Sequence, residues 1–465
     1  MASMDVRNKL ITKNPFTQEI TGEFAYDSLA QVQAKISQLK SNQKTWAALM
    51  LPERLQRVKE GMSYFEKNRE TIAIDICEQM GRPLHHARGE LNGFFERANY
   101  LCSIAETVLS PDVLTDKPGF DRSIEHVPLG LVFVISAWNY PLLITVNSVV
   151  PALLAGNTVL LKHSSLTPKI GAHFEKAFGQ LGGLQVLQQT IVDHQLTGRV
   201  IEEFPINHVV FTGSVSGGKS ILQHTAKKFM MPALELGGKD AAYIHKDADL
   251  QQAVDTVVDG AMFNAGQSCC GMERAYVHKD IYAEFVKMCQ KLISTYKMGD
   301  PKDEATSLGP LAQGKSAALM RQQVMEAERR GAKTLLGGNV QLIGSGTFFQ
   351  PTLLVDVKND MQIMQEENFG PILPVMPVSG LDEAIALVNE SPYGLTAAVF
   401  TKDLEVAKKF AQHADVGTVF MNRCDYLDPA LPWTGVRDSG CGSALSKYGF
   451  YHLTRRKGLH FKTKT

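Results

Sequence analysis

The sequence lacks an excess of charge of either sign, and this absence bears on what the protein binds. Its 465 residues contain 48 Lys plus Arg and 48 Asp plus Glu, so the formal net charge is zero. Without net positive charge, the protein as a whole has no field that attracts nucleic acid or an anionic membrane. We therefore expect neither of them among its partners.

Long apolar runs are also missing. The longest apolar stretches, around 129–138 and 146–155, are broken by Asn, Ser, Pro or Gly well before the roughly 18 residues that a membrane-spanning helix needs. The N-terminal segment 1–19 is polar and lacks the apolar centre of a signal peptide, and the final FKTKT contains no retention or lipidation signal. These features predict a protein with no membrane span and no export signal.

Cysteine pairs of the Cys-x-x-Cys type, which bind zinc or exchange disulfides, do not occur in the sequence. The seven cysteines are odd in number and scattered: Cys77, Cys102, Cys269, Cys270, Cys289, Cys424 and Cys441. This pattern favours a reducing compartment, so we expect a cytoplasmic protein without a metal site.

What the sequence does contain is the composition of a folded protein, with 44% hydrophobic and 21% charged residues. Its length predicts roughly two or three domains. Apolar residues recur at helical spacing from Asp27 to Leu109, with a break at Gly81 to Pro83. Short β-branched runs then alternate with amphipathic stretches: GLVFVIS, NTVLLK, QTIVD, HVVFTG and PALELGG. Such alternation predicts an α/β fold with a parallel sheet covered on both faces.

A second mixed region follows Gly238. We expect a helix over 249–263, a strand over 274–279, a helix over 287–296 and a strand over 352–356. Residues 366–371 and 431–442 are rich in Gly, Pro and Asp, so loops are expected there.

The segment GSVSGGKS at 213–220 matches the phosphate-binding pattern G-x-x-x-x-G-K-[ST], between an expected strand at 208–212 and an expected helix at 220–229. TLLVD, which ends at Asp356, has the form of the metal-binding acidic strand of nucleoside triphosphatases. The pyrophosphate of a dinucleotide would bind equally well to a strand, a glycine turn and a helix N-terminus in this order. The glycines also suit a plain tight turn, so the segment by itself leaves three interpretations open.

Three further positions have residue types that suit acyl chemistry. Cys269 follows a Gly-Gln turn in NAGQSCCGMER, where a thiol can be approached, although a lone cysteine is more often a small core residue, the role assigned to Cys270. Glu235 ends an apolar strand beside the glycines of LELGGKD, whose missing side chains leave room for a ligand. Glu235 is therefore either a general base or a charged residue that is exposed to solvent at the end of a strand. Asn139 in SAWNYP follows the first strand and suits an oxyanion donor or a turn.

Across nearly its full length, from NPFTQEITGE at Asn14 to DSGCGSALSKYG at Asp438, the sequence resembles the NAD(P)-dependent aldehyde dehydrogenase superfamily. The motifs that carry the resemblance are AWNYP, TVLLKHSSLTP, FTGS, LELGGKD, NAGQSCCGMER and EENFGPILPV. Several ordered motifs are more specific than one phosphate-loop match, so a P-loop nucleoside triphosphatase remains only as the alternative. Because Glu235 is present to activate water, the resemblance implies the hydrolytic, non-acylating branch.

The resemblance implies roles for individual residues. Cys269 would be the nucleophile, Glu235 the base that activates the deacylating water, and Asn139 the oxyanion donor. The residues implied to bind NAD or NADP are Trp138, Lys162, Ser165, Gly213, Ser214, Gly218, Glu367 and Phe369. The residues implied to line the aldehyde tunnel are Ile144, Asn147, Phe263 and Leu427. Lys219 and Ser220 would then have no phosphate role.

Departures from the family pattern affect the expected ligands. The succinate semialdehyde branch has an arginine where this chain has Phe263, which argues against a dicarboxylic semialdehyde, although Arg423 offers a cation. Ser165 stands where NAD-preferring relatives commonly have a glutamate that repels a 2′-phosphate. We therefore expect NADP to be used at least comparably to NAD, unless the serines of HSSLT only begin the next helix. SGCGSALSKYG also departs from the usual spacing, which affects the tunnel mouth.

The resemblance finally implies the architecture. A Rossmann-like coenzyme-binding domain would comprise 1–111 and 127–238, and an α/β catalytic domain would comprise 239–440. A small bridging oligomerisation sheet would comprise 112–126 and 441–465. Because such strands pair between subunits, a homodimer or homotetramer is expected.

Overall fold

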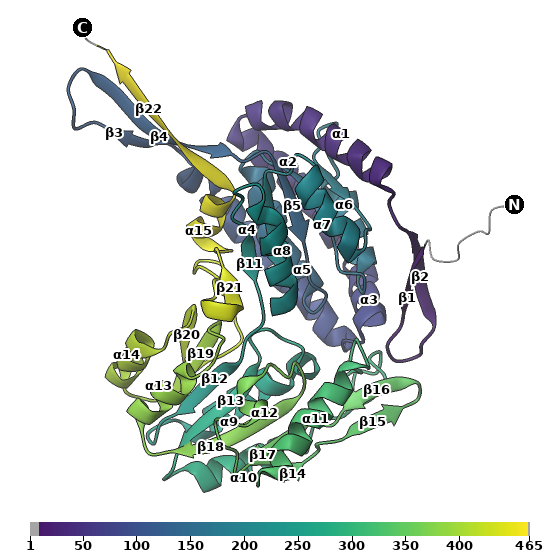
Figure 1. Cartoon of the computed structure of the whole chain (residues 1–465), viewed down its shortest axis with the longest axis vertical. Coiled ribbons are helices and arrows are strands. Elements are labelled where there is room, and N and C mark those ends of the chain that lie inside the picture. The colour runs from purple at the N-terminus through teal and green to yellow at the C-terminus, as the bar shows by residue number, and fades with distance from the viewer. Residues whose placement is uncertain (1–8, 464–465) are drawn as a thin grey trace, which may run out of the picture.

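The computed structural model describes residues 9–463. Residues 1–8 and 464–465 lie outside this range. They include the start of the polar N-terminal segment 1–19 and the outer ends of the predicted segments 1–111 and 441–465. Figure 1 shows two lobes, one built around β5 and the other around β13, with a narrow antiparallel sheet extending from the first lobe. No helix within 9–463 is long and apolar enough to cross a membrane.

The first lobe contains a six-stranded sheet in the order β21-β11-β10-β5-β6-β9. Its strands are β5 (Leu131–Ile135), β6 (Thr158–Lys162), β9 (Leu187–Gln189), β10 (His208–Thr212), β11 (Ala233–Glu235) and β21 (Gly440–Cys441). All neighbours are parallel except β21, which runs antiparallel to β11. The predicted parallel α/β sheet is confirmed, but QTIVD is not its edge strand, because β9 already ends at Gln189.

Helices cover both faces of this sheet (Figure 1). The N-terminal helices are α1 (Leu29–Ala48), α2 (Leu51–Lys67), α3 (Arg69–Met80) and α4 (Leu84–Leu109), and the crossover helices are α5 (Pro141–Leu154), α6 (Pro168–Phe178), α7 (His194–Glu203) and α8 (Val215–Ala226). Every residue of β5 is buried. Val132 and Val134 belong to one apolar cluster and Leu131, Phe133 and Ile135 to the other, as the two-residue period of a strand requires.

The second lobe contains a seven-stranded sheet in the order β14-β17-β18-β13-β12-β19-β20. Its strands are β12 (Asp240–Ile244), β13 (Met272–His278), β14 (Lys333–Leu336), β17 (Thr352–Val355), β18 (Ile372–Val378), β19 (Thr396–Phe400) and β20 (Thr418–Met421). Its helices are α9 (Leu250–Met262), α10 (Tyr282–Ile293), α11 (Ser316–Arg329), α12 (Gln362–Gln365), α13 (Leu381–Asn389) and α14 (Leu404–His413). The helix expected at 287–296 therefore begins and ends earlier, whereas the one expected at 249–263 matches α9 closely.

The extended antiparallel sheet has the order β22-β4-β3, with β3 (Asp112–Leu114), β4 (Phe120–Pro128) and β22 (Thr454–Lys462). Cys441 lies in β21 of the six-stranded sheet, and α15 (Ser446–His452) packs against α4 and α5. Of the predicted bridging segment 441–465, only β22 thus belongs to the extended sheet within the described chain. Three short hairpins complete the structure: β1 (Lys9–Lys13) with β2 (Ile20–Ala25), β7 (Gln180–Leu181) with β8 (Leu184–Gln185), and β15 (Val340–Ile343) with β16 (Gly346–Phe349).

Candidate active site

A cavity of about 400 Å³ contains both Cys269 and Glu235. Cys269 comes from the loop that follows α9, and Glu235 is the last residue of β11. The four residues expected to line a tunnel also line this cavity: Ile144, Asn147, Phe263 and Leu427. The structure therefore brings together, from four parts of the chain, the nucleophile, the base and the tunnel positions that the sequence suggested.

The turn before Cys269 is made by three consecutive residues with left-handed backbone conformations. These are Asn264 (φ 54°), Ala265 (φ 55°) and Gly266 (φ 68°). A Cβ atom on Gly266 would lie 2.0 Å from the carbonyl oxygen of Gly370, so only glycine fits there. The turn ends the helical region of α9 and leaves Cys269 partly exposed to the cavity, as expected from the sequence.

The two glycines after Glu235 have a different role from the expected one. A Cβ atom on Gly237 would lie 2.5 Å from a carboxylate oxygen of Glu367, and one on Gly238 would lie 2.3 Å from the carbonyl oxygen of Cys269. The space beside them is occupied by the protein itself and not left for a ligand. The glycines instead allow β11 and the Cys269 loop to approach closely.

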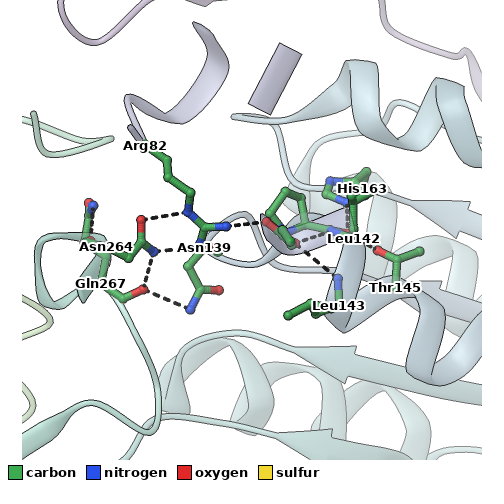
Figure 2. A network of polar contacts seen from close by, with 10 residues as sticks. Arg82, Asn139, Leu142, Leu143, Thr145, His163, Asn264 and Gln267 are labelled. Carbon is green, nitrogen blue, oxygen red and sulfur yellow. Dashed lines mark hydrogen bonds and ion pairs between the residues drawn. The ribbon is translucent and has the colours of Figure 1, made fainter. Parts of the chain in front are cut away.

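Figure 2 shows a buried network that fixes Asn139 relative to this turn. Arg82 donates to Asn264 Oδ1 at 3.1 Å and to the Asn139 carbonyl oxygen, and it forms an ion pair with Glu90. The Asn264 side chain donates to the Asn139 carbonyl at 3.2 Å and to the Gln267 carbonyl at 3.0 Å. Asn139 Nδ2 donates to the Gln267 carbonyl at 3.2 Å. Asn139 and the Cys269 loop are thus held by shared partners.

The sequence did not reveal the structural role of Arg82 and Glu90, whose exposed fractions are 2% and 5%. Glu90 accepts hydrogen bonds from the backbone N–H groups of Leu142 (2.8 Å) and Leu143 (3.2 Å) and so caps the N-terminus of α5, whose own N-cap residue supplies no side-chain bond. The sequence does place two opposite charges eight residues apart, Arg82 in the break between α3 and α4 and Glu90 on α4. Such charges are usually solvated, so the sequence alone does not indicate a buried ion pair.

Burial sets the protonation of the acidic groups in the cavity. Burial raises the pKa of Glu235 to about 8, while the positive charge of Arg97 and a hydrogen bond from Trp433 act in the opposite direction. Burial likewise raises the pKa of Asp425 to about 7, and Asp425 accepts a hydrogen bond from Cys270 Sγ at 2.9 Å. Both carboxyl groups therefore hold their protons to higher pH than exposed ones do.

Cys270, next to Cys269 in the chain, is 4% exposed. A hydrogen bond with Cys269, burial and the charge of Asp425 raise the pKa of the Cys270 thiol well above its usual value. A thiol that keeps its proton is a poor nucleophile, which agrees with the core role assigned to Cys270.

The residues expected to bind a dinucleotide surround the carboxyl ends of β5, β6 and β10. Lys162 ends β6 and is 7% exposed, and its Nζ donates no hydrogen bond to any residue within 9–463. Burial lowers its pKa, and the charge of Asp193 acts in the opposite direction. Ser214 is the exposed N-cap of α8, and its Oγ accepts from the Gly217 N–H at 3.2 Å. An unpartnered cation and an open helix N-terminus suit the ribose and phosphates of a dinucleotide.

The loop expected to seat the nicotinamide is fixed by a buried ion pair that the sequence did not reveal. Lys239 Nζ lies 2.6 Å from Glu273 Oε2, and Glu273 accepts from the backbone N–H groups of Asn368 (2.9 Å) and Phe369 (3.0 Å). Phe369 has a left-handed backbone (φ 52°), and its ring meets that of Trp138 edge to face at 5.7 Å.

Glu367 lies in the same loop and accepts from the Gly238 N–H at 3.1 Å. Burial and the charge of Glu273 raise its pKa to about 8. The loop therefore presents Glu367 and Phe369 from a rigid backbone.

Ser165 lies at the exposed turn before α6. It lines a second cavity, of about 650 Å³, together with Lys13 of β1 and Lys315 before α11. No carboxylate is among the residues that line it in the described chain.

The phosphate-loop interpretation of 213–220 is wrong. The helix begins at Val215 and not at Ser220, because Ser214 caps it, so Gly217, Gly218 and Lys219 lie inside α8 and no loop is left to wrap a triphosphate. A Cβ atom on Gly218 would lie 2.6 Å from Leu236 Cδ2, so this glycine serves helix packing. Lys219 is exposed and forms an ion pair with Asp438 at 3.2 Å. Asp356 directly follows β17, a strand of the other sheet.

Comparison with known proteins agrees with this geometry. A model of the aldehyde dehydrogenase family matches residues 3–459. The NADP(+)-dependent succinate-semialdehyde dehydrogenase of Deinococcus radiodurans is 34% identical over 468 residues, covering 100% of this chain and 97% of its own.

Solved structures give the same result. The chain matches lactaldehyde dehydrogenase from Escherichia coli with a TM-score of 0.93 and 29% identity, over 98% of this chain and 96% of that one. It matches betaine aldehyde dehydrogenase from Staphylococcus aureus, solved in complex with NAD+, with a TM-score of 0.93 and 26% identity, over 100% of this chain and 94% of that one.

Proposed function

The chain belongs to the aldehyde dehydrogenase family, whose members oxidise aldehydes to acids with NAD(P), and from this premise we propose that the reaction passes through a thioester on Cys269. The observation that carries the proposal is the shared cavity of Cys269 and Glu235. A nucleophile and a base that open onto one enclosed space can act in turn on the same acyl group.

The first step is attack of the Cys269 thiolate on the aldehyde carbonyl carbon, which forms a carbon–sulfur bond and leaves an oxyanion. Asn139 Nδ2 carries two hydrogens, and one of them is used by the Gln267 carbonyl. The other, together with the Cys269 backbone N–H, is assigned to the oxyanion. The Arg82 network holds Asn139 in place, so these donors need little rearrangement.

NAD(P), when bound, supplies the two-electron acceptor for this oxidation. The residues assigned to hold it are Lys162 on a ribose, Ser214 at the N-terminus of α8 on the pyrophosphate, and Glu367 and Phe369 on the nicotinamide side. The donor set fits, because Lys162 is 7% exposed and its Nζ forms no hydrogen bond or ion pair with another side chain or backbone group within residues 9–463.

The second half of the reaction is hydrolysis of the thioester. Glu235 removes a proton from a water molecule, whose oxygen attacks the acyl carbon, and the carbon–sulfur bond breaks to release the acid and the Cys269 thiolate. Because only the ionised carboxylate can accept the proton, the raised pKa of Glu235 makes this step depend on pH near 8.

NADP is proposed as a cofactor that is used at least comparably to NAD. Ser165 is exposed and brings no negative charge to the turn that follows Lys162 and β6. The repulsion by which a carboxylate would exclude a 2′-phosphate is therefore missing.

Localisation and assembly are proposals of the same kind. All seven cysteines are free, which suits a reducing cytoplasm. Val113 of β3 and Phe461 of β22 are 67% and 55% exposed on the extended sheet, and covering such residues favours a homodimer or homotetramer.

The decisive experiment is an aldehyde panel with NAD and NADP, followed by the absorbance of the reduced cofactor. We expect aldehyde-dependent reduction that Cys269→Ala abolishes and Cys270→Ala largely retains. Activity that depends on Cys270 and survives in Cys269→Ala would contradict the assignment of the nucleophile. No ATP hydrolysis that depends on Lys219 is expected.

A further inference from the structure

The cavity that holds Cys269 also contains a buried cation that the proposed reaction does not use. Arg97 of α4 is 7% exposed and lines the cavity. Its Nη1 donates to the Leu143 carbonyl oxygen at 3.2 Å and to Asn147 Oδ1 at 3.3 Å. Both acceptors are neutral, and within residues 9–463 no carboxylate forms an ion pair with Arg97. Its Nε and Nη2 groups donate to no residue in that range.

An unpaired buried guanidinium is costly, because burial removes water that would otherwise solvate the charge. The contrast with Arg82 in the same cavity is direct, since Arg82 is neutralised by Glu90. His86 adds no charge, because burial lowers its pKa to about 3 and its ring stacks on Phe263 at 4.3 Å. Arg97 is therefore the cation of this cavity whose charge is left for a ligand.

The acidic groups of the cavity do not cancel that charge. Glu235 and Asp425 hold their protons towards neutral pH, and Asp425 is engaged by Cys270. Glu96 is exposed and accepts the hydroxyl hydrogen of Tyr426. The charge of Arg97 acts on both Glu235 and Cys270, which places it near the reacting groups.

We propose that Arg97 binds a carboxylate on the substrate, so that the preferred substrates are short aldehydes with an anionic group at the other end. This inference rests on the proposed aldehyde oxidation and adds the substrate class. Arg97 thereby takes the role of the carboxylate-binding cation, for which the sequence offered only positions 263 and 423. Position 263 is a phenylalanine that stacks on His86, and Arg423 is exposed, with its guanidinium over the Tyr426 ring at 3.6 Å. A guanidinium with unused N–H groups matches a carboxylate in both charge and geometry.

The test compares two aldehydes of the same shape. 4-Oxobutanoate carries a carboxylate where 4-methylpentanal carries an isopropyl group. We expect the wild type to prefer 4-oxobutanoate in kcat/KM. Arg97→Gln should lower that preference, measured as the ratio of kcat/KM for 4-oxobutanoate over 4-methylpentanal, by about 10- to 100-fold, mainly through KM for 4-oxobutanoate. The ratio cancels any change in rate that both aldehydes share because Arg97 also acts on Glu235. Arg97→Lys should restore part of the preference, and Arg423→Gln, the matched control, should leave it unchanged.

A second measurement does not depend on turnover. Butanedioate, an unreactive dianion, should slow alkylation of Cys269 by iodoacetamide in the wild type and in Arg97→Lys, but not in Arg97→Gln. A wild type that prefers 4-methylpentanal, or an Arg97→Gln variant that loses both aldehydes equally, would overturn the carboxylate site and leave aldehyde oxidation standing. If the wild type oxidised neither aldehyde with either cofactor, the proposed function would fail, and protection by butanedioate would still decide the role of Arg97.

Discussion

The Glu235 carboxyl group illustrates how one residue couples stability to catalysis. Its pKa in the folded protein is about 8, above the ordinary value, so the folded state binds the proton more tightly than the unfolded state. Stability is therefore lost as pH rises from the ordinary glutamate pKa towards 8. Glu235→Gln should stabilise the protein at pH 7 by about 1 to 3 kcal/mol and should give a burst of reduced cofactor without turnover. Urea unfolding and rapid-mixing absorbance measure the two effects, and full steady-state turnover in this variant would refute the assigned base.

A second single residue, Ser165, is expected to affect the choice between NADP and NAD. Ser165→Glu places a carboxylate where a 2′-phosphate is expected and should shift the ratio of kcat/KM for NADP over NAD about 5- to 150-fold towards NAD. The comparison of both cofactors in wild type and variant measures this shift. A wild type that strongly prefers NAD, with a ratio that Ser165→Glu does not move, would show that this position does not contact the ribose.

At the level of elements, Arg82 joins the break after α3 to the start of α5 and to the turn after α9 (Figure 2). Arg82→Met removes the partner of the buried Glu90 and should destabilise the protein by about 3 to 5 kcal/mol, because the carboxylate is left buried without a counter-charge. Urea unfolding measures the loss. Arg88→Met, on α4 and exposed, removes ion pairs to Glu70 and Glu304 and should change stability little. Equal effects of the two variants would contradict the importance of the buried pair.

For the whole molecule, the extended β22-β4-β3 sheet is the expected site of assembly. Phe461→Asp places a charge on its exposed apolar surface and should shift the protein towards a smaller species in size-exclusion chromatography or analytical ultracentrifugation. Leu342→Asp is the matched control, since Leu342 is 71% exposed on β15 in the other lobe. A wild type that is monomeric at all concentrations would contradict the predicted oligomer.

The sequence by itself determined the features that depend on short stretches of chain. Strand β5 is a continuous apolar run in the sequence because both of its faces are covered. Helix α9 was predicted from apolar residues at helical spacing, and Asp249 caps it. The turn before Cys269 was also predictable, because Gly266 marks a change of chain direction. The resemblance to aldehyde dehydrogenases rests on such local motifs.

Only the tertiary structure decided which charged residues are buried and what they face. Arg82 lies in the break before α4, and Glu90 and Arg97 lie on α4, where charged side chains are usually solvated. They are buried because α4 packs against α5 beside the Cys269 loop. The start of α8 was likewise missed, because the hydrogen bond from the Gly217 N–H to the Ser214 side chain outweighs the low helix propensity of two glycines. The physical reason is the same in both cases: a local pattern states what a residue can do, whereas burial and hydrogen-bond partners come from segments far away in the chain.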